Sequence, residues 1–75
     1  MFNQLKISLF DLDITIRELT VLDFIADGMT NKEIGDKIFL SKRTIEGIRE
    51  SLLVKTNSKN TAALIAFSFR SGILT

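Results

Sequence analysis

Three helix-start signals at short spacing constrain this chain more than any other feature. Thr15 and Thr30 each stand three residues before a glutamate, and Ser41 precedes a third run of apolar residues at helical spacing. A threonine followed three residues later by glutamate is a capping box, in which each side chain bonds a backbone amide that the helix itself leaves free. The chain has no proline and no β-hairpin signal, so the sequence predicts an all-α fold.

Four helices follow from these signals. The first opens at Thr15 and ends at Gly28, and the second begins after Thr30. The third follows Ser41, and the fourth runs from a cap near Asn60 to about Ser71, just before Gly72. Asn57, between the third and fourth helices, is expected in the left-handed conformation, which Asn tolerates better than most residues. The predicted inward positions are Val21, Leu22, Ile25, Ala26, Ile34, Ile38, Ile45, Ile48 and Leu52.

Residues 1–13 carry a weaker pattern. Leu5, Ile7, Leu9 and Leu12 alternate loosely with polar residues. This alternation fits an extended arm lying on the helices, and it equally fits the remnant of a linker. The predicted architecture is therefore a four-helix bundle over residues 14–75 with a short N-terminal arm.

Composition narrows the chemistry open to the chain. Its 75 residues make one small domain, and it contains neither cysteine nor histidine. The usual soft metal ligands and nucleophile–base pairs are thus absent, so we expect no enzyme, no metal and no cofactor. The longest apolar run, at residues 62–67, is too short to span a bilayer, and no signal peptide precedes it. A cytoplasmic location is expected.

The charges divide along the chain. Residues 1–29 hold two basic against five acidic side chains, whereas residues 30–60 hold seven basic against four acidic ones. The net charge of +1 therefore conceals a basic middle segment. Such asymmetry favours a polyanionic partner, although a solvated face on an ordinary helical domain would look the same.

The second and third helices are separated by only Phe39 and Leu40 before the Ser41 cap. Two helices joined so tightly must cross steeply, which is the helix-turn-helix arrangement. In that geometry the second helix presents its first turns to the base edges of DNA. The residues that project from its outer side are Lys42, Arg43, Glu46, Gly47 and Glu50.

Several segments in one ungapped register carry a family resemblance. They are Ile14–Glu18 with Val21 and Leu22, Ala26–Gly28, Asn31–Ile34, Ser41, Arg43–Glu46, Arg49, Lys55, Ala66 and Gly72–Leu74. From Ile14 to Leu74 the chain resembles the DNA-binding domain of LuxR-type bacterial transcription regulators. Such domains often follow a response-regulator receiver domain. The resemblance implies a free-standing regulator or the output end of a longer signalling protein with an N-terminal receiver or sensor domain.

The resemblance also implies roles for particular residues. The third helix, about residues 42–56, would read the major groove of double-stranded DNA. The implied phosphate contacts are Asn31, Lys32, Ser41, Lys42, Arg43 and Thr44, and the implied base-facing residues are Glu46, Gly47 and Glu50. A capped helix N-terminus with two cations attracts anions, and glutamate can accept from cytosine N4. For the two glutamates, pairing with basic neighbours within the helix is the alternative.

The chain departs from the family pattern at several positions. Gly35 stands where the family usually has alanine, which costs the second helix about 1 kcal/mol unless closer packing compensates. Ile48 replaces a common histidine, and Thr61 a frequent arginine. Thr56 and Asn57 replace a usual Leu-Gly pair at the corner before the fourth helix.

The fourth helix is apolar on nearly every side. With Leu64, Ile65 and Ser68 inward, its outer face would carry Ala63, Ala66, Phe67 and Arg70. A small domain cannot bury the whole circumference of a helix, so this face predicts a homodimer, as the resemblance also implies. The N-terminal arm folded over the face is the alternative.

Two rival functions remain open from the sequence. In one, the chain is a helical protein–protein interaction module whose basic stripe binds an acidic protein surface and which reads no DNA. A partner would then dock on the fourth helix and leave the third helix free. In the other, an acid–base pair drawn from Glu18, Asp36, Glu46 or Glu50 makes it an enzyme, but no spacing places two of these carboxylates in one pocket.

Overall fold

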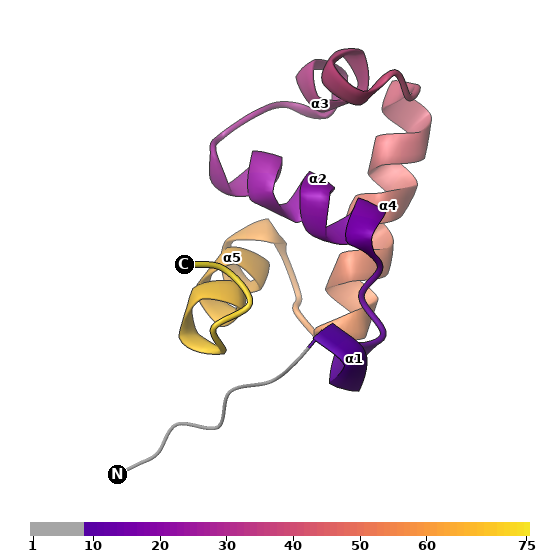
Figure 1. Cartoon of the computed structure of the whole chain (residues 1–75). Coiled ribbons are helices and arrows are strands. Elements are labelled where there is room, and N and C mark those ends of the chain that lie inside the picture. Colours follow the sequence, from indigo (N-terminus) through magenta and orange to yellow (C-terminus); the bar gives the residue numbers. More distant parts are fainter. Residues whose placement is uncertain (1–8) are drawn as a thin grey trace, which may run out of the picture.

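The computed structural model describes residues 9–75, and within that range it contains helices and no strand. The elements are α1 (Leu9–Leu12), α2 (Ile16–Ala26), α3 (Asn31–Ile38), α4 (Lys42–Lys55) and α5 (Thr61–Arg70). The longest helix, α4, packs against α2, α3 and α5. Figure 1 shows α3 at one end of α4, with α1 near the opposite end of α4. The all-α four-helix bundle is confirmed, with a one-turn helix added in front of it.

The helices begin at the capping residues that the sequence predicted. Thr15, Thr30, Ser41 and Asn60 are the N-caps of α2 to α5, and each side chain accepts a hydrogen bond from a backbone amide in the first turn. Both capping boxes are complete. The amide of Thr15 donates to Glu18 Oε1 at 2.9 Å, and that of Thr30 donates to Glu33 Oε1 at 2.8 Å. These local bonds fix the chain direction at each helix start.

Three helices end with a left-handed residue whose following amide closes the helix end, and Asp13 after α1 and Gly72 after α5 also have positive φ. Gly28 follows α2 at φ 85°, Phe39 follows α3 at 61°, and Asn57 follows α4 at 53°. In each case the next amide donates to a carbonyl five residues back, the bond that closes a left-handed helix end. The prediction for Asn57 is confirmed, and so is the stop at Gly28. An aromatic residue in this conformation at position 39 was not anticipated.

The core lies where α4 meets its neighbours. Its fully buried apolar side chains come from all four long helices: Val21, Leu22, Ile34, Ile45, Leu52 and Leu64. Ile14 and Leu74 close the core from the two flanking segments. Ile48 is half-buried and packs against this core, so the position tolerates an apolar side chain. The predicted inward stripe of α4 is therefore confirmed.

The segment before α2 differs from an extended arm. Residues 9–12 form one helical turn, and Leu12 is half-buried against the core. Lys55 Nζ donates to the carbonyl oxygen of Asp13 at 2.6 Å, which ties this segment to the end of α4. Leu5 and Ile7 lie outside the described residues. Among residues 9–75, no helix is long and apolar enough to cross a membrane.

Candidate nucleic-acid interface

The turn between α3 and α4 depends on a close backbone approach at Gly35. This residue is buried, and a Cβ atom built on it would collide with the carbonyl oxygen of Leu40. The amide of Leu40 in turn donates to the Gly35 carbonyl oxygen at 2.9 Å. The glycine therefore lets the turn fold tightly onto α3. This close packing is the compensation that the sequence suggested for losing alanine.

The first turn of α4 faces outward with two cations on it. Ser41 Oγ accepts from the Thr44 amide at 3.0 Å and lies 2.9 Å from Thr44 Oγ1. Lys42, Arg43 and Thr44 are all exposed, like the Ser41 cap. Within residues 9–75, Lys42 and Arg43 form no ion pair with the protein. Four of the predicted phosphate-contacting residues are thus brought together at one helix start, with both charges available to a ligand.

The predicted base-facing residues lie one to two turns further along α4. Glu46, Gly47 and Glu50 are exposed, and nothing lies within 4 Å of the place where a Cβ of residue 47 would stand. In the described part of the chain, neither glutamate pairs with a basic neighbour, so the expected intrahelical alternative is not formed. Their carboxylates are free to meet a ligand. Base reading itself stays a prediction.

Asn31 and Lys32, at the start of α3, are already engaged within the protein. Asn31 is half-buried, and its Oδ1 accepts from Arg49 Nε at 3.0 Å. Lys32 Nζ lies 2.9 Å from Asp36 Oδ2, and this hydrogen bond raises the pKa of the lysine. Because the Lys32–Asp36 pair is highly exposed, it contributes little to stability and can be exchanged for a phosphate contact. These two residues are therefore less ready to bind than Lys42 and Arg43.

Arg49 connects three helices, a role that the sequence did not reveal. From the middle of α4 its Nε donates to Asn31 of α3, and its Nη1 donates to Thr61 Oγ1 of α5 at 3.0 Å. Both partners are the first residues of their helices. Thr61 thus has a structural use where the family often has arginine. No local pattern could show this link, because the partners are 18 and 12 residues away.

Glu18 joins α2 to α4 besides capping its own helix. Its Oε2 accepts from Ser51 Oγ at 2.6 Å, and its Oε1 accepts from Lys55 Nζ at 2.7 Å. Burial raises the pKa of the Glu18 carboxyl. The hydrogen bonds from Lys55, Ser51 and the Thr15 amide, with the Lys55 charge, more than offset this, and the pKa falls from 4.5 to about 2. Glu18 is a structural anion that holds α4 against α2.

The other carboxylates named for the enzymatic alternative are not gathered around Glu18. Asp36 pairs with Lys32 on exposed α3, and Glu46 and Glu50 lie on the outer side of α4. Between residues 9 and 75 the structure brings no three acidic side chains together in a way that could hold a metal ion. The four carboxylates named for that alternative therefore lie in separate surroundings.

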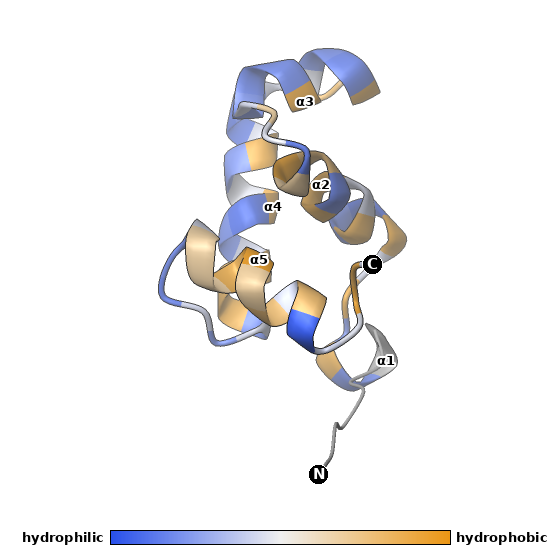
Figure 2. Ribbon diagram, turned by 90° about the vertical axis from the view of Figure 1, so that its left-hand side faces the viewer, coloured by the Kyte–Doolittle hydropathy of each residue, from blue (hydrophilic) through white to orange (hydrophobic). Residues whose placement is uncertain are grey.

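On α5 the inward residues are as predicted. Leu64 and Ser68 are fully buried, and Ile65 packs against the core. Of the predicted outer face, Arg70 is exposed, and Ala63, Ala66 and Phe67 are half-buried. Figure 2 shows α5 as mainly hydrophobic in colour, in contrast to the hydrophilic colour that prevails on α3. The structure thus leaves an apolar side of α5 partly open to solvent.

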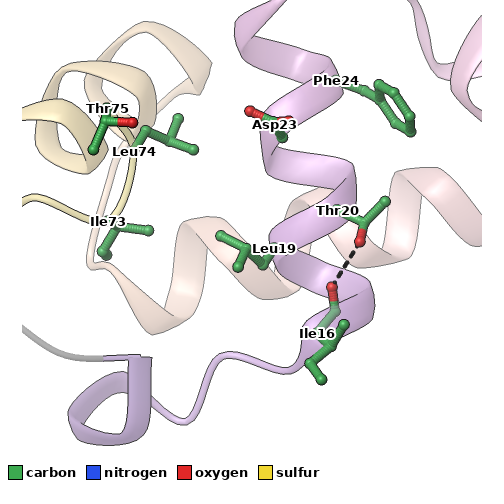
Figure 3. A pocket seen from close by; sticks show the side chains of 8 residues that line it. All are labelled: Ile16, Leu19, Thr20, Asp23, Phe24, Ile73, Leu74 and Thr75. Atoms are coloured by element: carbon green, nitrogen blue, oxygen red, sulfur yellow. Dashed lines mark hydrogen bonds between the residues drawn. The ribbon is translucent and has the colours of Figure 1, made fainter.

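A hollow of about 360 Å³ lies between α2 and the C-terminal segment. Figure 3 shows its lining: Ile16, Leu19, Thr20, Asp23, Phe24, Ile73, Leu74 and Thr75. No residue of α3 or α4 contributes to it. The hollow is therefore separate from the exposed turns of α4.

Comparison with known proteins identifies the family of this chain. The family described as bacterial regulatory proteins, luxR family, matches residues 13–68. This match covers most of the chain, and the chain belongs to that family. It is a helix-turn-helix DNA-binding domain of the kind used in transcription regulation, as the sequence resemblance implied.

Its relatives are longer transcription regulators. The virulence-factor transcription regulator BvgA of Bordetella pertussis is 42% identical over 57 residues, which are 76% of this chain and 27% of BvgA. The transcriptional regulator ycf29 of Pyropia yezoensis is 41% identical over 61 residues, covering 81% and 28% of the two chains. The oxygen regulatory protein NreC of Staphylococcus carnosus is 36% identical over 58 residues, covering 77% and 27%. The chain thus spans little more than a quarter of their length. No solved structure matches it.

Proposed function

We propose that this chain binds double-stranded DNA sequence-specifically by placing α4 in the major groove. The observation that carries the proposal is the outward-facing start of α4, where Lys42 and Arg43 stand exposed and unpaired within the described residues beside the Ser41 cap. Cations at a capped helix start neutralise phosphates and position the helix on the duplex. Exposed side chains one turn later then meet base edges.

The proposed contacts divide into two groups. Phosphates are bound by the residues at the starts of α3 and α4: Asn31, Lys32, Ser41, Lys42, Arg43 and Thr44. Glu46, Gly47 and Glu50 face the bases. A glutamate at the groove repels phosphates and accepts from cytosine N4, so it lowers general affinity and raises selectivity. Gly47 lets the helix backbone come close to the base pairs.

The test of DNA binding uses duplexes that the wild-type chain selects from a random pool. Binding of the selected duplex should weaken steeply with salt, with a log–log slope near −0.9 for each phosphate contact. Lys42→Ala should lower the affinity for all duplexes and make the slope shallower by about 0.9. Binding that does not depend on salt would contradict the proposal.

Glu46→Ala tests base reading in the same assay. The substitution should change which base is preferred at one position by about 1–3 kcal/mol and leave the salt slope at its wild-type value. A variant that loses the same affinity on selected and on unrelated duplexes would show that Glu46 does not discriminate between bases.

The setting of the domain in a whole regulator is also a proposal. Since the relatives are more than three times as long as the aligned segment, we propose an output domain preceded by a receiver or sensor domain in a longer cytoplasmic regulator. We further propose that two copies pair through Ala63, Ala66, Phe67 and Arg70 on the outer face of α5. A twofold dimer would require two DNA half-sites related by symmetry.

The rival interaction module makes a different prediction. It would leave α4 free while a protein partner covers α5, and the selected duplexes would show no common sequence. Lys42 and Arg43, which are exposed and form no ion pair within residues 9–75, favour a polyanion such as DNA on α4 over a partner that leaves this helix free.

A further inference from the structure

Phe39, in the turn between α3 and α4, combines two features that folding does not explain. Its backbone has φ 61° and ψ 41°, in the left-handed region, and its side chain is 93% exposed. A single exposed apolar side chain is ordinary on a protein surface. A bulky aromatic residue in the left-handed conformation is not, because its Cβ crowds the neighbouring carbonyl oxygen.

The rest of the chain shows which residues such a position usually receives. The corresponding left-handed positions after α2 and α4 hold Gly28 and Asn57, and Gly72 and Asp13 have positive φ after α5 and α1. Aspartate, like asparagine, has a short polar side chain that can bond locally in this conformation, which the ring of Phe39 cannot do. Glycine and asparagine are the two residues that adopt this conformation at least cost. A glycine at position 39 would close α3 with less strain. Ending α3 therefore does not require the phenylalanine, because glycine would end the helix at lower cost.

Packing does not account for the ring either. Phe39 is the most exposed of the large hydrophobic side chains in the described part of the chain, and it does not belong to the core cluster or to the apolar residues packed against it. Its neighbour Leu40, by contrast, is half-buried and packs on the core. The left-handed turn thus points the aromatic side chain into solvent while the next residue turns inward.

The surroundings of Phe39 indicate what it meets. Lys37 is exposed in the last turn of α3, and Lys42 and Arg43 are exposed in the first turn of α4. The ring thus lies in the turn between cations that precede and follow it in the chain, and no acidic side chain occurs between Lys37 and Arg43. A partner that satisfies these cations is polyanionic, and one that also offers an apolar face beside its charges is DNA.

We propose that Phe39 is a DNA-contacting residue, whose ring packs on apolar C–H groups at the edge of the major groove beside the phosphates bound by Lys42 and Arg43. This inference rests on the proposed function and adds a residue to it. Two DNA groups offer such a surface, the methyl group of thymine and the face of a deoxyribose. Burying the ring against either group repays the strained backbone only when the complex forms.

Phe39→Gly and Phe39→Ala together separate the ring from the backbone. Both remove the ring, but only glycine relieves the left-handed residue. Both variants should bind the selected duplex about tenfold more weakly, with the salt slope of the wild type because no cation is lost. Phe39→Gly should meanwhile raise the melting temperature by about 5 °C. A merely structural role cannot make the protein more stable and a weaker binder at once.

Control variants distinguish a failure of the Phe39 inference from a failure of the proposed function. Val54→Ala removes another highly exposed apolar side chain, near the far end of α4, and should leave binding unchanged. If Lys42→Ala makes the salt slope shallower as expected but both Phe39 variants bind like the wild type, the inference about Phe39 is overturned and the proposed function stands. If wild-type binding shows no salt dependence, the proposed function fails first.

Deoxyuridine in place of each thymidine distinguishes the two apolar surfaces. If removing one methyl group weakens DNA binding by the wild type but not by Phe39→Ala, that thymine is the contact. If no replacement has this effect while both variants still bind weakly, the contact is to deoxyribose. The contact would be refuted if every replacement weakened the wild type and Phe39→Ala equally and the Phe39 substitutions themselves did not weaken binding.

Discussion

Single residues in this domain carry two different kinds of task, and the two capping-box glutamates show the contrast. Glu18 and Glu33 occupy the same position in two successive helices. Glu33 is exposed and bonds only its own helix start, which lowers its pKa, first through the Thr30 amide. Glu18 is 7% exposed and also binds Ser51 and Lys55 of α4. The same sequence motif is thus a local cap in one helix and a link between helices in the other.

The acid stability of the domain should depend on Glu18. Its folded-state pKa of about 2 lies below the ordinary 4.5, so its stabilisation is full above about pH 4.5 and is lost as the pH falls toward 2. The displacement corresponds to about 3 kcal/mol. Urea unfolding at several pH values should therefore show Glu18→Gln far less stable than the wild type at pH 7, with the difference shrinking below pH 4.

Glu33→Gln is the matched control for this experiment, because it changes the same motif without a partner on another helix. It should lose much less stability at pH 7. If the two substitutions proved equally costly, the link from Glu18 to Lys55 would not be the source of the stabilisation.

At the scale of the elements, the glycines of α3 and α4 have different effects on how these two helices form and pack. Gly35 faces the backbone of Leu40, where a Cβ does not fit, whereas Gly47 faces open space in the middle of an exposed helix. Glycine in a helix interior is about 1 kcal/mol less favourable than alanine. Both glycines therefore lower the helix propensity by the same amount. At Gly35 the close approach of Leu40 requires it, whereas at Gly47 nothing in the free protein requires a glycine.

Alanine at the two positions should have opposite effects on stability. Gly47→Ala should stabilise the domain by about 1 kcal/mol, because helix propensity is the only change. Gly35→Ala should destabilise it by about 1–3 kcal/mol, since two backbone segments must move apart. Chemical denaturation of both variants measures the two changes. A Gly35→Ala protein more stable than the wild type would mean that the turn shifts without cost.

Arg49 sets how α3 and α5 sit on α4. One guanidinium holds the first residue of each neighbouring helix, at Asn31 and Thr61. Arginine suits this task because its planar fork donates in several fixed directions. The orientation of α4 relative to its neighbours thus depends on contacts at its middle as well as on the turn that precedes it.

Over the whole molecule, charge and apolar surface occupy different elements. The basic segment of residues 30–60 includes α3 and α4, and the apolar outer face belongs to α5. Figure 2 shows α5 as mainly hydrophobic in colour and α3 as mainly hydrophilic. A protein arranged in this way can bind DNA with one end and a second copy with another, which is the arrangement that the proposed dimer requires.

Two phenylalanines on α5 test the proposed dimer. Phe67 belongs to the proposed face and Phe69 does not, because two residues turn about 200° around a helix. Phe67→Ser should abolish cooperative occupancy of paired half-sites and leave binding to a single half-site, whereas Phe69→Ser should retain both. Sedimentation of the complexes and melting temperatures of the free variants complete the comparison. Cooperative binding by Phe67→Ser would contradict the proposed face.

The sequence by itself determined α2 to α5, their caps, the inward stripe of α4 and the exposure of Lys42, Arg43, Glu46 and Glu50. These features depend on bonds within a few residues and on the 3.6-residue period, so they can be read locally. It also predicted the left-handed Asn57 and the family.

Only the tertiary structure decided how distant residues meet. Glu18 reaches Lys55 and Arg49 reaches Asn31 because of the angles at which the helices cross, which no local pattern encodes. The helical turn at residues 9–12 and the outward Phe39 belong here too. A marginally stable domain selects among local conformations through the packing of the whole chain, and this packing holds Phe39 in a left-handed conformation for which the local rule favours glycine.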